Sequence, residues 1–373
     1  MMQMIRFAPV LVIAAVFLVQ QADARALKVG LAIPLEGSFA PLGEQVLEGF
    51  SLATKNKASQ FSDVIEGEDR CDAESGAESA DSFIEAGVDI VVGYLCAESL
   101  AAALPVLSEA NIPVMTLSVR ADIIGEEANR HDWLFYRLAP RASEEAQIAS
   151  QQIIGLWADR PFALIEDGTI LGREMLETVR VQLEERGLKP NFIDNYRPGQ
   201  ERQPSLVRRL KAAGAAKVFV GGERRDLAII ARDAAETGLD LRFMGGDALH
   251  APQGEIALPE GTLAIIATSA LPDIASQEAI DAFEQAGLAI EGIRLPAYSA
   301  GEILLAVSTR LSFNEGTVED ILETTSFETA MGPVSFDETG ERKEPGFSLA
   351  IWRNGAFARI SPREVLEAKG DDQ

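Results

Sequence analysis

A chain of 373 residues exceeds one ordinary domain, so its length predicts two. Hydrophobic residues make up 47 % of it and charged residues only 24 %, which is enough apolar material for substantial cores. The formal net charge of -25 argues against nucleic acid as a partner, because phosphates require a basic patch, and it also disfavours an anionic membrane surface.

The N-terminus, residues 1–24, has the pattern of an export signal. Arg6 supplies a positive start, residues 7–19 form an apolar run, and Ala22 to Ala24 offer small residues for cleavage. Cleavage after Ala24 is the first choice and cleavage after Ala26 the second. The apolar run is shorter than the roughly 20 residues that a membrane-spanning helix needs, and no cysteine near the cleavage site could accept lipid. We therefore expect a mature protein that is free in the periplasm.

Short apolar runs rich in β-forming residues then alternate with helix-period segments, which is typical of a parallel α/β fold. We expect strands in two series, at residues 27–35, 88–95, 112–118 and 133–140, and then at 161–167, 191–196, 217–222, 242–247 and 262–269. We expect helices between them at residues 43–59, 74–86, 99–110, 143–157, 173–185, 204–213 and 226–237. The nearly continuous apolar strands predict sheets covered on both faces.

The pattern changes after Pro272. Three helical stretches follow, at residues 277–286, 296–311 and 317–324, and then β-structure at 331–340 and 347–360. Asn354-Gly355 is a strong two-residue hairpin signal in the last segment. We therefore expect two similar lobes, with the chain crossing between them more than once. The predicted division assigns residues 25–142 and 271–329 to the first lobe, and residues 143–270 and 330–373 to the second.

In an oxidising compartment the two cysteines, Cys71 and Cys96, are most simply a disulfide, because they allow only one intramolecular pairing. A redox or metal site is the alternative, but it would require a nearby CxxC motif or histidines. The chain has only His131 and His250, which are far apart in sequence and cannot build the usual zinc sites.

No motif in the sequence indicates catalysis. The chain lacks GxSxG, Walker A and HExxH strings, and the loop after the first strand, GLAIPLEG, lacks the GxGxxG spacing of nucleotide loops. Asp337, Glu338 and Gly340 only loosely resemble a calcium loop, and a turn before the hairpin explains them better. We expect no enzyme activity, no cofactor and no metal.

Several strings resemble the periplasmic branched-chain amino-acid (Leu/Ile/Val-type) binding family, the type I solute-binding proteins of ABC transporters. They are KVGLAIPLEGSFAPLGEQVLEGFSLA near the start, CDAESGAESA at Cys71, VGYLCAESL at Cys96, FMGGD at Phe243 and MGPVSFDETGE at Met331. The resemblance runs from Leu27 to about Ile360. It implies a type I periplasmic-binding-protein fold, with two Rossmann-like lobes, three hinge crossovers and a ligand cleft between the lobes. It also implies that the two cysteines form the family's disulfide.

The binding residues that the resemblance implies depart from the family's pattern. Ala97 stands where a small hydroxyl residue is usual, Leu42 and Leu171 stand where aromatic residues are usual, and Glu223 stands at another aromatic position. Ser118, Val119 and Arg120 occupy a trio that is usually small residues with a hydroxyl, and Asp247 keeps the acidic position that pairs with a ligand ammonium.

This pattern leaves two ligand classes open. An amino acid would place its ammonium on Asp247, with Glu223 as a second acid, and its carboxylate on Arg120 as a bidentate pair. A plain carboxylate would use Arg120 alone, with Asp247 orienting it. A third alternative has no ligand role for Arg120, which would then pair with Glu98 or another acid at the cleft rim. Leu42, Ala97 and Leu171 would be cleft lining.

We therefore expect a solute-binding component of an ABC importer, which binds a small amino acid or a related polar metabolite between its lobes. Its expected partners are the solute and an inner-membrane permease with its ATPase, and the resemblance implies a monomer. The alternatives are a binding protein for a small organic carboxylate or amide, and a ligand-dependent partner of a signalling protein.

Overall fold

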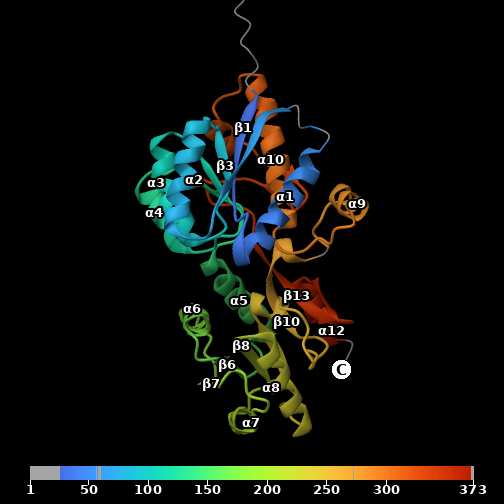
Figure 1. The fold of residues 1–373 in the computed structure, drawn as a ribbon. Coiled ribbons are helices and arrows are strands. Elements are labelled where there is room, and N and C mark those ends of the chain that lie inside the picture. The colour runs from blue at the N-terminus through green and yellow to red at the C-terminus, as the bar shows by residue number, and fades with distance from the viewer. Residues whose placement is uncertain (1–25, 56, 58–59, 272, 371–373) are drawn as a thin grey trace, which may run out of the picture.

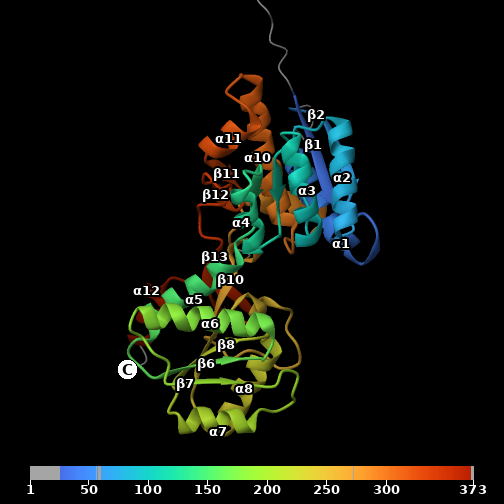
Figure 2. The same cartoon turned by 90° about the vertical axis from the view of Figure 1, so that its left-hand side faces the viewer.

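The computed structural model describes residues 26–370 apart from residues 56, 58–59 and 272. The predicted export signal, residues 1–24, lies outside this range. Two lobes lie one above the other, and a narrow waist of three chain segments joins them (Figures 1 and 2). No helix in the described part of the chain is long and apolar enough to cross a membrane.

The first lobe is built on a five-stranded parallel sheet in the order β2-β1-β3-β4-β5. Its strands are β1 (Leu27–Ile33), β2 (Phe61–Glu68), β3 (Ile90–Gly93), β4 (Val114–Thr116) and β5 (Phe135–Arg137). Its helices are α1 (Ala40–Thr54), α2 (Ala73–Ala86), α3 (Ala97–Glu109), α4 (Asp122–Arg130), α9 (Gln277–Ala286), α10 (Arg294–Ser312) and α11 (Val318–Thr324). A short antiparallel pair, β11 (Phe327–Thr329) and β12 (Gly332–Val334), completes this lobe.

The second lobe has a seven-stranded sheet in the order β14-β13-β10-β9-β8-β6-β7. Its strands are β6 (Phe162–Glu166), β7 (Phe192–Asn195), β8 (Lys217–Gly221), β9 (Arg242–Gly245), β10 (Leu263–Ala267), β13 (Phe347–Arg353) and β14 (Ala356–Arg359). Its helices are α5 (Ala142–Trp157), α6 (Ile170–Glu185), α7 (Pro204–Ala212), α8 (Arg224–Glu236) and α12 (Pro362–Gly370). Strand β13 pairs in the antiparallel sense with both β10 and β14, and Asn354-Gly355 forms the predicted hairpin turn, with positive φ at both residues.

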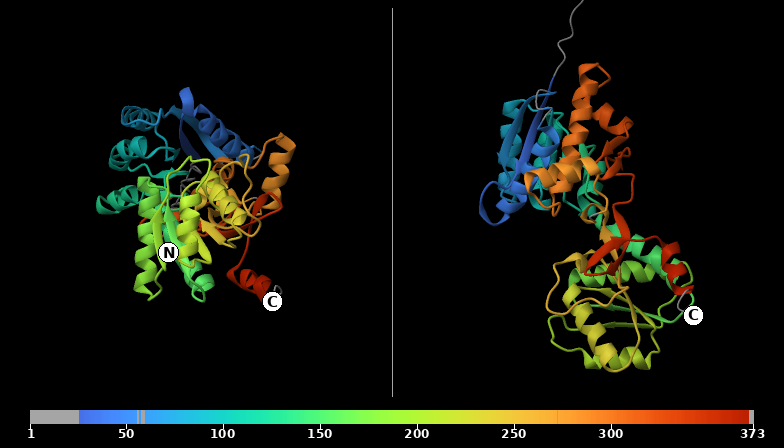
Figure 3. Two further views of the ribbon diagram at one scale, coloured as in Figure 1. Left: turned by 90° about the horizontal axis from the view of Figure 1, so that it is seen from below. Right: turned by 90° about the vertical axis from the view of Figure 1, so that its right-hand side faces the viewer.

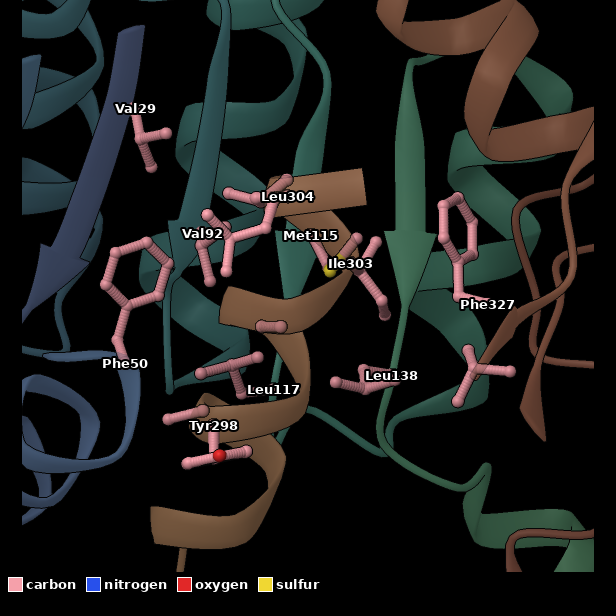
Figure 4. Close-up of a cluster of buried hydrophobic side chains, with 14 of the residues drawn as sticks. Val29, Phe50, Val92, Met115, Leu117, Leu138, Tyr298, Ile303, Leu304 and Phe327 are labelled. Carbon is pink, nitrogen blue, oxygen red and sulfur yellow. The ribbon is translucent and has the colours of Figure 1, made fainter. Parts of the chain in front are cut away.

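Each sheet is buried on both faces, as the apolar strands predict. One core of the first lobe lies between the sheet and the helices α1 and α10, and Figure 4 shows Phe50, Met115 and Leu304 meeting there. The opposite face packs on α2 and α3, where Phe83 and Leu104 are fully buried. Two further clusters cover the faces of the second sheet.

The sequence prediction missed strand β2, helix α4 and the short strand β11 of the first lobe. Strand β2 lies at the sheet edge and exposes much of its surface, so it lacks the apolar run by which buried strands are recognised. Helix α4 is short and contains Gly125, which breaks the usual pattern. A Cβ atom at Gly125 would lie 2.7 Å from Nη2 of Arg137 and 2.4 Å from Oε1 of Glu341, so a larger residue there would displace the side chains of this ion pair.

The chain runs between the lobes at three places, as Figure 3 shows from the side. The first crossover joins β5 to α5, the second joins β10 to α9, and the third leads from β12 to β13. The sequence division assigned residues 330–373 to the second lobe, whereas Ala330, Met331 and Phe336 lie in the core of the first. We propose that the third crossover comprises residues 337–346.

The disulfide between Cys71 and Cys96 is confirmed. It joins the loop before α2 to the residue that precedes α3, so it ties together two neighbouring connections in the first lobe.

Candidate functional site

A cavity of about 560 Å³ lies where the two lobes face each other. Most of its wall comes from the second lobe, at the carboxyl ends of β6, β8 and β9, which is where ligands bind in parallel α/β sheets. The first lobe contributes Arg120 and Asp122. The remaining lining residues are Ala142, Ser143, Glu145, Ala146, Asp167, Thr169, Leu171, Gly172, Glu174, Met175, Thr178, Gly221, Gly222, Glu223, Gly246, Asp247 and Ala248.

The loop after β6 forms one side of the cavity. Oδ1 of Asp167 accepts hydrogen bonds from the backbone N–H of Thr169, at 2.9 Å, and from its hydroxyl, at 2.6 Å. Thr169 in turn caps α6, because its hydroxyl oxygen accepts a hydrogen bond from the N–H of Gly172. A Cβ atom at Gly172 would lie 2.3 Å from Oδ1 of Asp167, so glycine is required for this packing.

The loop after β8 forms the adjoining wall and covers a buried tyrosine. Tyr196 is 5 % exposed, and its hydroxyl has no hydrogen-bond partner among the described residues. A Cβ atom at Gly222 would lie 2.0 Å from this hydroxyl. The tyrosine ring can therefore pack directly behind this loop only because residue 222 is glycine. Burial raises the pKa of Tyr196, with smaller contributions from nearby carboxylates, so the hydroxyl stays protonated.

An ion pair joins the two lobes across the cavity. Nη1 of Arg120, in the first lobe, lies 2.8 Å from Oδ2 of Asp247, in the second. The other oxygen of Asp247 accepts a hydrogen bond from the N–H of Ala267 at 2.9 Å, which fixes its orientation. The guanidinium of Arg120 lies 5.3 Å from the ring centroid of Phe347, within cation–π range. The pair is partly exposed, so its direct contribution to stability is small.

Glu145 lies behind this ion pair, in the first turn of α5. Its Oε1 accepts a hydrogen bond of 2.7 Å from the N–H of Asp247. Burial raises the pKa of Glu145 to about 7, and the nearby carboxylate of Asp247 adds to this rise, while the hydrogen bond and Arg120 oppose it. Glu145 therefore changes its charge near neutral pH, at the point where the first crossover meets the cavity.

The cavity is strongly acidic. Its lining includes six carboxyl groups but one cation, Arg120, and Asp247 already pairs with that cation. The whole chain has 58 acidic residues against 33 basic ones, so the cavity is more acidic than the average composition of the protein. The six residues are Asp122, Glu145, Asp167, Glu174, Glu223 and Asp247.

Of the seven ligand-binding residues predicted from the sequence, four line this cavity: Arg120, Leu171, Glu223 and Asp247. Arg120 pairs with a protein acid, as the alternative of an ion pair with Glu98 or another acid at the cleft rim expected; that acid is Asp247. Glu223 immediately precedes α8, and Leu171 is 79 % exposed at the start of α6.

The other three predicted residues, all in the first lobe, do not line the cavity. Leu42 is half-buried in α1 and packs against the core of its lobe. Ala97 is the exposed first residue of α3. The hydroxyl of Ser118 donates a hydrogen bond of 2.9 Å to the carbonyl of Leu95, so it is used within the lobe.

The sequence reasoning did not single out Glu145 or Asp167. Asp167 directly follows a buried strand, so the rule that ligands bind beyond strand ends could have found it. Glu145 lies on a helix, 102 residues before its partner Asp247, and no local pattern marks it. Among the described residues, no group of three or more His, Cys, Asp or Glu side chains is placed to hold a metal ion.

Comparisons with known proteins agree with this architecture. A family model described as periplasmic binding protein matches residues 26–356. A leucine-, isoleucine-, valine-, threonine- and alanine-binding protein of Pseudomonas aeruginosa is 28 % identical over 344 residues, which cover 88 % of this chain and 91 % of the relative. A Leu/Ile/Val-binding protein homolog of Brucella suis is 27 % identical, and the alignment covers 89 % of this chain and 92 % of that protein.

Solved structures with this fold include a putative branched-chain amino acid ABC transporter protein from Rhodospirillum rubrum. It has a TM-score of 0.77 at 19 % identity, over 90 % of this chain and all of the other. A solute-binding protein from Rhodopseudomonas palustris in complex with p-hydroxybenzoic acid has a TM-score of 0.64 at 15 % identity, over 90 % of this chain and 95 % of the other. The fold is therefore that of type I periplasmic binding proteins. With its family model matched over nearly the whole described range, this chain belongs to the periplasmic binding protein family.

Proposed function

We propose that this protein is the periplasmic receptor of an ABC importer, and that it binds a small amino acid or a related amine-bearing metabolite between its lobes. It then delivers the solute to a membrane permease that is driven by an ATPase, and it acts as a monomer. Its family consists of binding proteins, so the protein acts by binding and closure, without catalysis. The observation that carries the proposal is the acidic inter-lobe cavity with its single, paired arginine.

The charges of the cavity favour a ligand that carries an ammonium group. Carboxylates that become buried when the lobes close are costly unless they are paired, and a cationic group can pair with several of them. Glu174 and Glu223 form no ion pair with any described residue, and Oδ2 of Asp167 accepts no hydrogen bond from one, so these acids have capacity for a ligand. The names of the aligned relatives, which bind amino acids, support the same ligand class.

The ion pair itself has the charge pattern of an α-amino acid. A zwitterionic solute has one ammonium and one carboxylate, so it can replace the pair between Arg120 and Asp247 by two new pairs of the same kind. Asp247 would then bind the ammonium and Arg120 the carboxylate. The exchange conserves charge neutrality, so neither side chain is left with an unpaired charge when the lobes close.

We propose that exposed apolar side chains beyond the strand ends contribute to the driving force for closure. Of the ten large hydrophobic side chains that are exposed in the described structure, five lie beyond the carboxyl ends of strands that face the other lobe: Leu35, Phe39, Ile123, Ile170 and Leu171. Complete burial of one such side chain contributes about 1.5–3 kcal/mol. We propose that the structure represents the open state, and that solute binding shifts the population toward a state that covers them.

A thermal-shift panel tests this function. Mature protein is unfolded and refolded to remove bound solute, and then mixed with amino acids, amines, amides and plain carboxylates. A ligand at 100 times its dissociation constant adds about 2.7 kcal/mol, so the melting temperature should rise by several degrees. We expect a rise with an amine-bearing solute, its loss in Asp247→Asn, and its retention in Asp240→Asn, a control in an exposed loop outside the cavity.

Two results would contradict the proposal. A shift with plain carboxylates alone, lost in Arg120→Ala, would make the protein a receptor for organic acids. No shift with any compound would favour the alternative of a partner for a signalling protein.

A further inference from the structure

A second cavity, of about 230 Å³, lies at the hinge and is separate from the solute cavity. One wall is the first crossover and the adjoining face of α5, and the other wall is the third crossover, residues 341–346. This volume is many times the roughly 10–15 Å³ that one water molecule needs. The cavity can therefore hold a small ion or molecule that touches two of the three connections between the lobes.

The acidic side chains around this hinge cavity already have partners within the protein. Oε1 of Glu144 accepts a hydrogen bond of 2.7 Å from the N–H of Gly346. Glu341 pairs at 3.1 Å with the fully buried Arg137. Glu344 accepts hydrogen bonds from the N–H and the hydroxyl of Ser335, at 2.9 and 2.7 Å. These carboxylates consequently hold the crossover segments in place, and each has its charge partly satisfied there.

The three cations of the same cavity form few ion pairs and hydrogen bonds with the described residues. The side chain of Arg342 is only 7 % exposed, yet its Nε has no hydrogen-bond partner among the described residues and lies 3.9 Å from Oε2 of Glu344, a loose ion pair. Its one hydrogen bond goes from Nη2 to the carbonyl of Pro345 at 3.4 Å, a long distance. Arg141 and Lys343 are exposed and form no ion pair with any described residue.

A buried guanidinium without full pairing is unfavourable, and burial lowers the pKa of Arg342 accordingly. The guanidinium has five N–H donors in a planar fork, which suits oxyanions. Arg141 comes from the first crossover, and Arg342 and Lys343 come from the third, so the three cations converge on one space from two directions.

We propose that this hinge cavity is a binding site for a small oxyanion, such as inorganic phosphate or a short dicarboxylate. Arg342 provides the buried donor, and Arg141 and Lys343 neutralise the remaining charge from the two crossovers. The bound anion links these two crossovers to each other.

Titration calorimetry with inorganic phosphate in a buffer of low ionic strength tests the proposal, with sulfate and malonate as further probes. We expect saturable binding to one site. The double variant Arg141→Gln/Lys343→Gln should weaken it about tenfold or more, because two charge-assisted contacts are lost. The variant Arg186→Gln/Lys189→Gln removes the same charge from an exposed part of the second lobe and should bind phosphate as the wild type does.

The double variant changes only exposed side chains, so it avoids the folding defect that a change of the buried Arg342 would risk. The solute-site variant Asp247→Asn should leave phosphate binding unchanged, which separates this site from the proposed solute function. The proposal is overturned if none of the three anions binds saturably, or if Arg141→Gln/Lys343→Gln binds phosphate as tightly as the wild type.

Discussion

Replacement of Glu145 by glutamine should stabilise the protein above neutral pH and have little effect at acidic pH. Burial raises the pKa of this carboxyl to about 7 in the folded protein, against an ordinary value of 4.5. Between these two values the folded state holds the proton more tightly than the unfolded state does. The ionised carboxylate therefore costs folding free energy, and the cost grows as the pH rises from 4.5 to 7.

The size of this effect follows from the two pKa values. Each unit of difference corresponds to about 1.4 kcal/mol, so the full cost is about 3 kcal/mol at pH 8 and below about 1 kcal/mol at pH 5. Glutamine is neutral at both pH values, and its amide oxygen can still accept the hydrogen bond from the N–H of Asp247. We therefore expect Glu145→Gln to gain about 2–3 kcal/mol at pH 8.

Urea unfolding of the wild type and Glu145→Gln at pH 5, 6.5 and 8 measures the effect. Glu174→Gln serves as the control, because Glu174 lines the same cavity but is exposed, and its replacement should change stability by less than about 0.5 kcal/mol at each pH. The reasoning is refuted if the stability difference between the wild type and Glu145→Gln is the same at pH 5 and pH 8, or if glutamine destabilises the protein at pH 8.

Two further predictions concern the fold. Removal of the disulfide in Cys71→Ser/Cys96→Ser should lower the free energy of unfolding by about 3.5 kcal/mol, because the bond closes a loop with a sequence separation of 25. Urea unfolding of the variant, and of the wild type with and without reductant, measures this loss. Gly340→Ala should destabilise the protein far more than Gly355→Ala. Both glycines have positive φ, which costs alanine about 1–2 kcal/mol. Only at Gly340 would the added Cβ also meet another atom, the carbonyl oxygen of Phe135 at 1.7 Å. Equal losses of melting temperature in the two variants would contradict this.

The sequence predicted most of the fold because buried parallel strands have a distinct composition. Strands such as β6 and β8 are buried along their whole length, and their apolar runs marked them. Strand β2 was missed because an edge strand with one solvated face does not need a continuous run of apolar residues. The sequence division placed the third crossover too early. Phe336 is apolar and could pack in the core of either lobe, and only the tertiary structure shows that it joins the core of the first.

The candidate site was predictable where its residues directly follow strands. Glu223 comes two residues after β8, and Asp247 two residues after β9; the family resemblance singled out both, and their positions agree with the rule that ligands bind beyond strand ends. The ion pair between Arg120 and Asp247 spans 127 residues, and the choice between Glu98 and Asp247 as partner depends on how the lobes face each other. That arrangement is a property of the tertiary structure, and no short-range pattern encodes it.

The most direct test of the account is native mass spectrometry of the protein purified from a periplasmic extract without refolding. We predict that a fraction of the molecules carries one bound small compound that contains an amino group. This complex should persist in Asp240→Asn and be absent from Asp247→Asn. A bound compound without an amino group, or one that Asp247→Asn retains at the wild-type level, would contradict the central claim that the acidic cavity between the lobes is an amine-binding site.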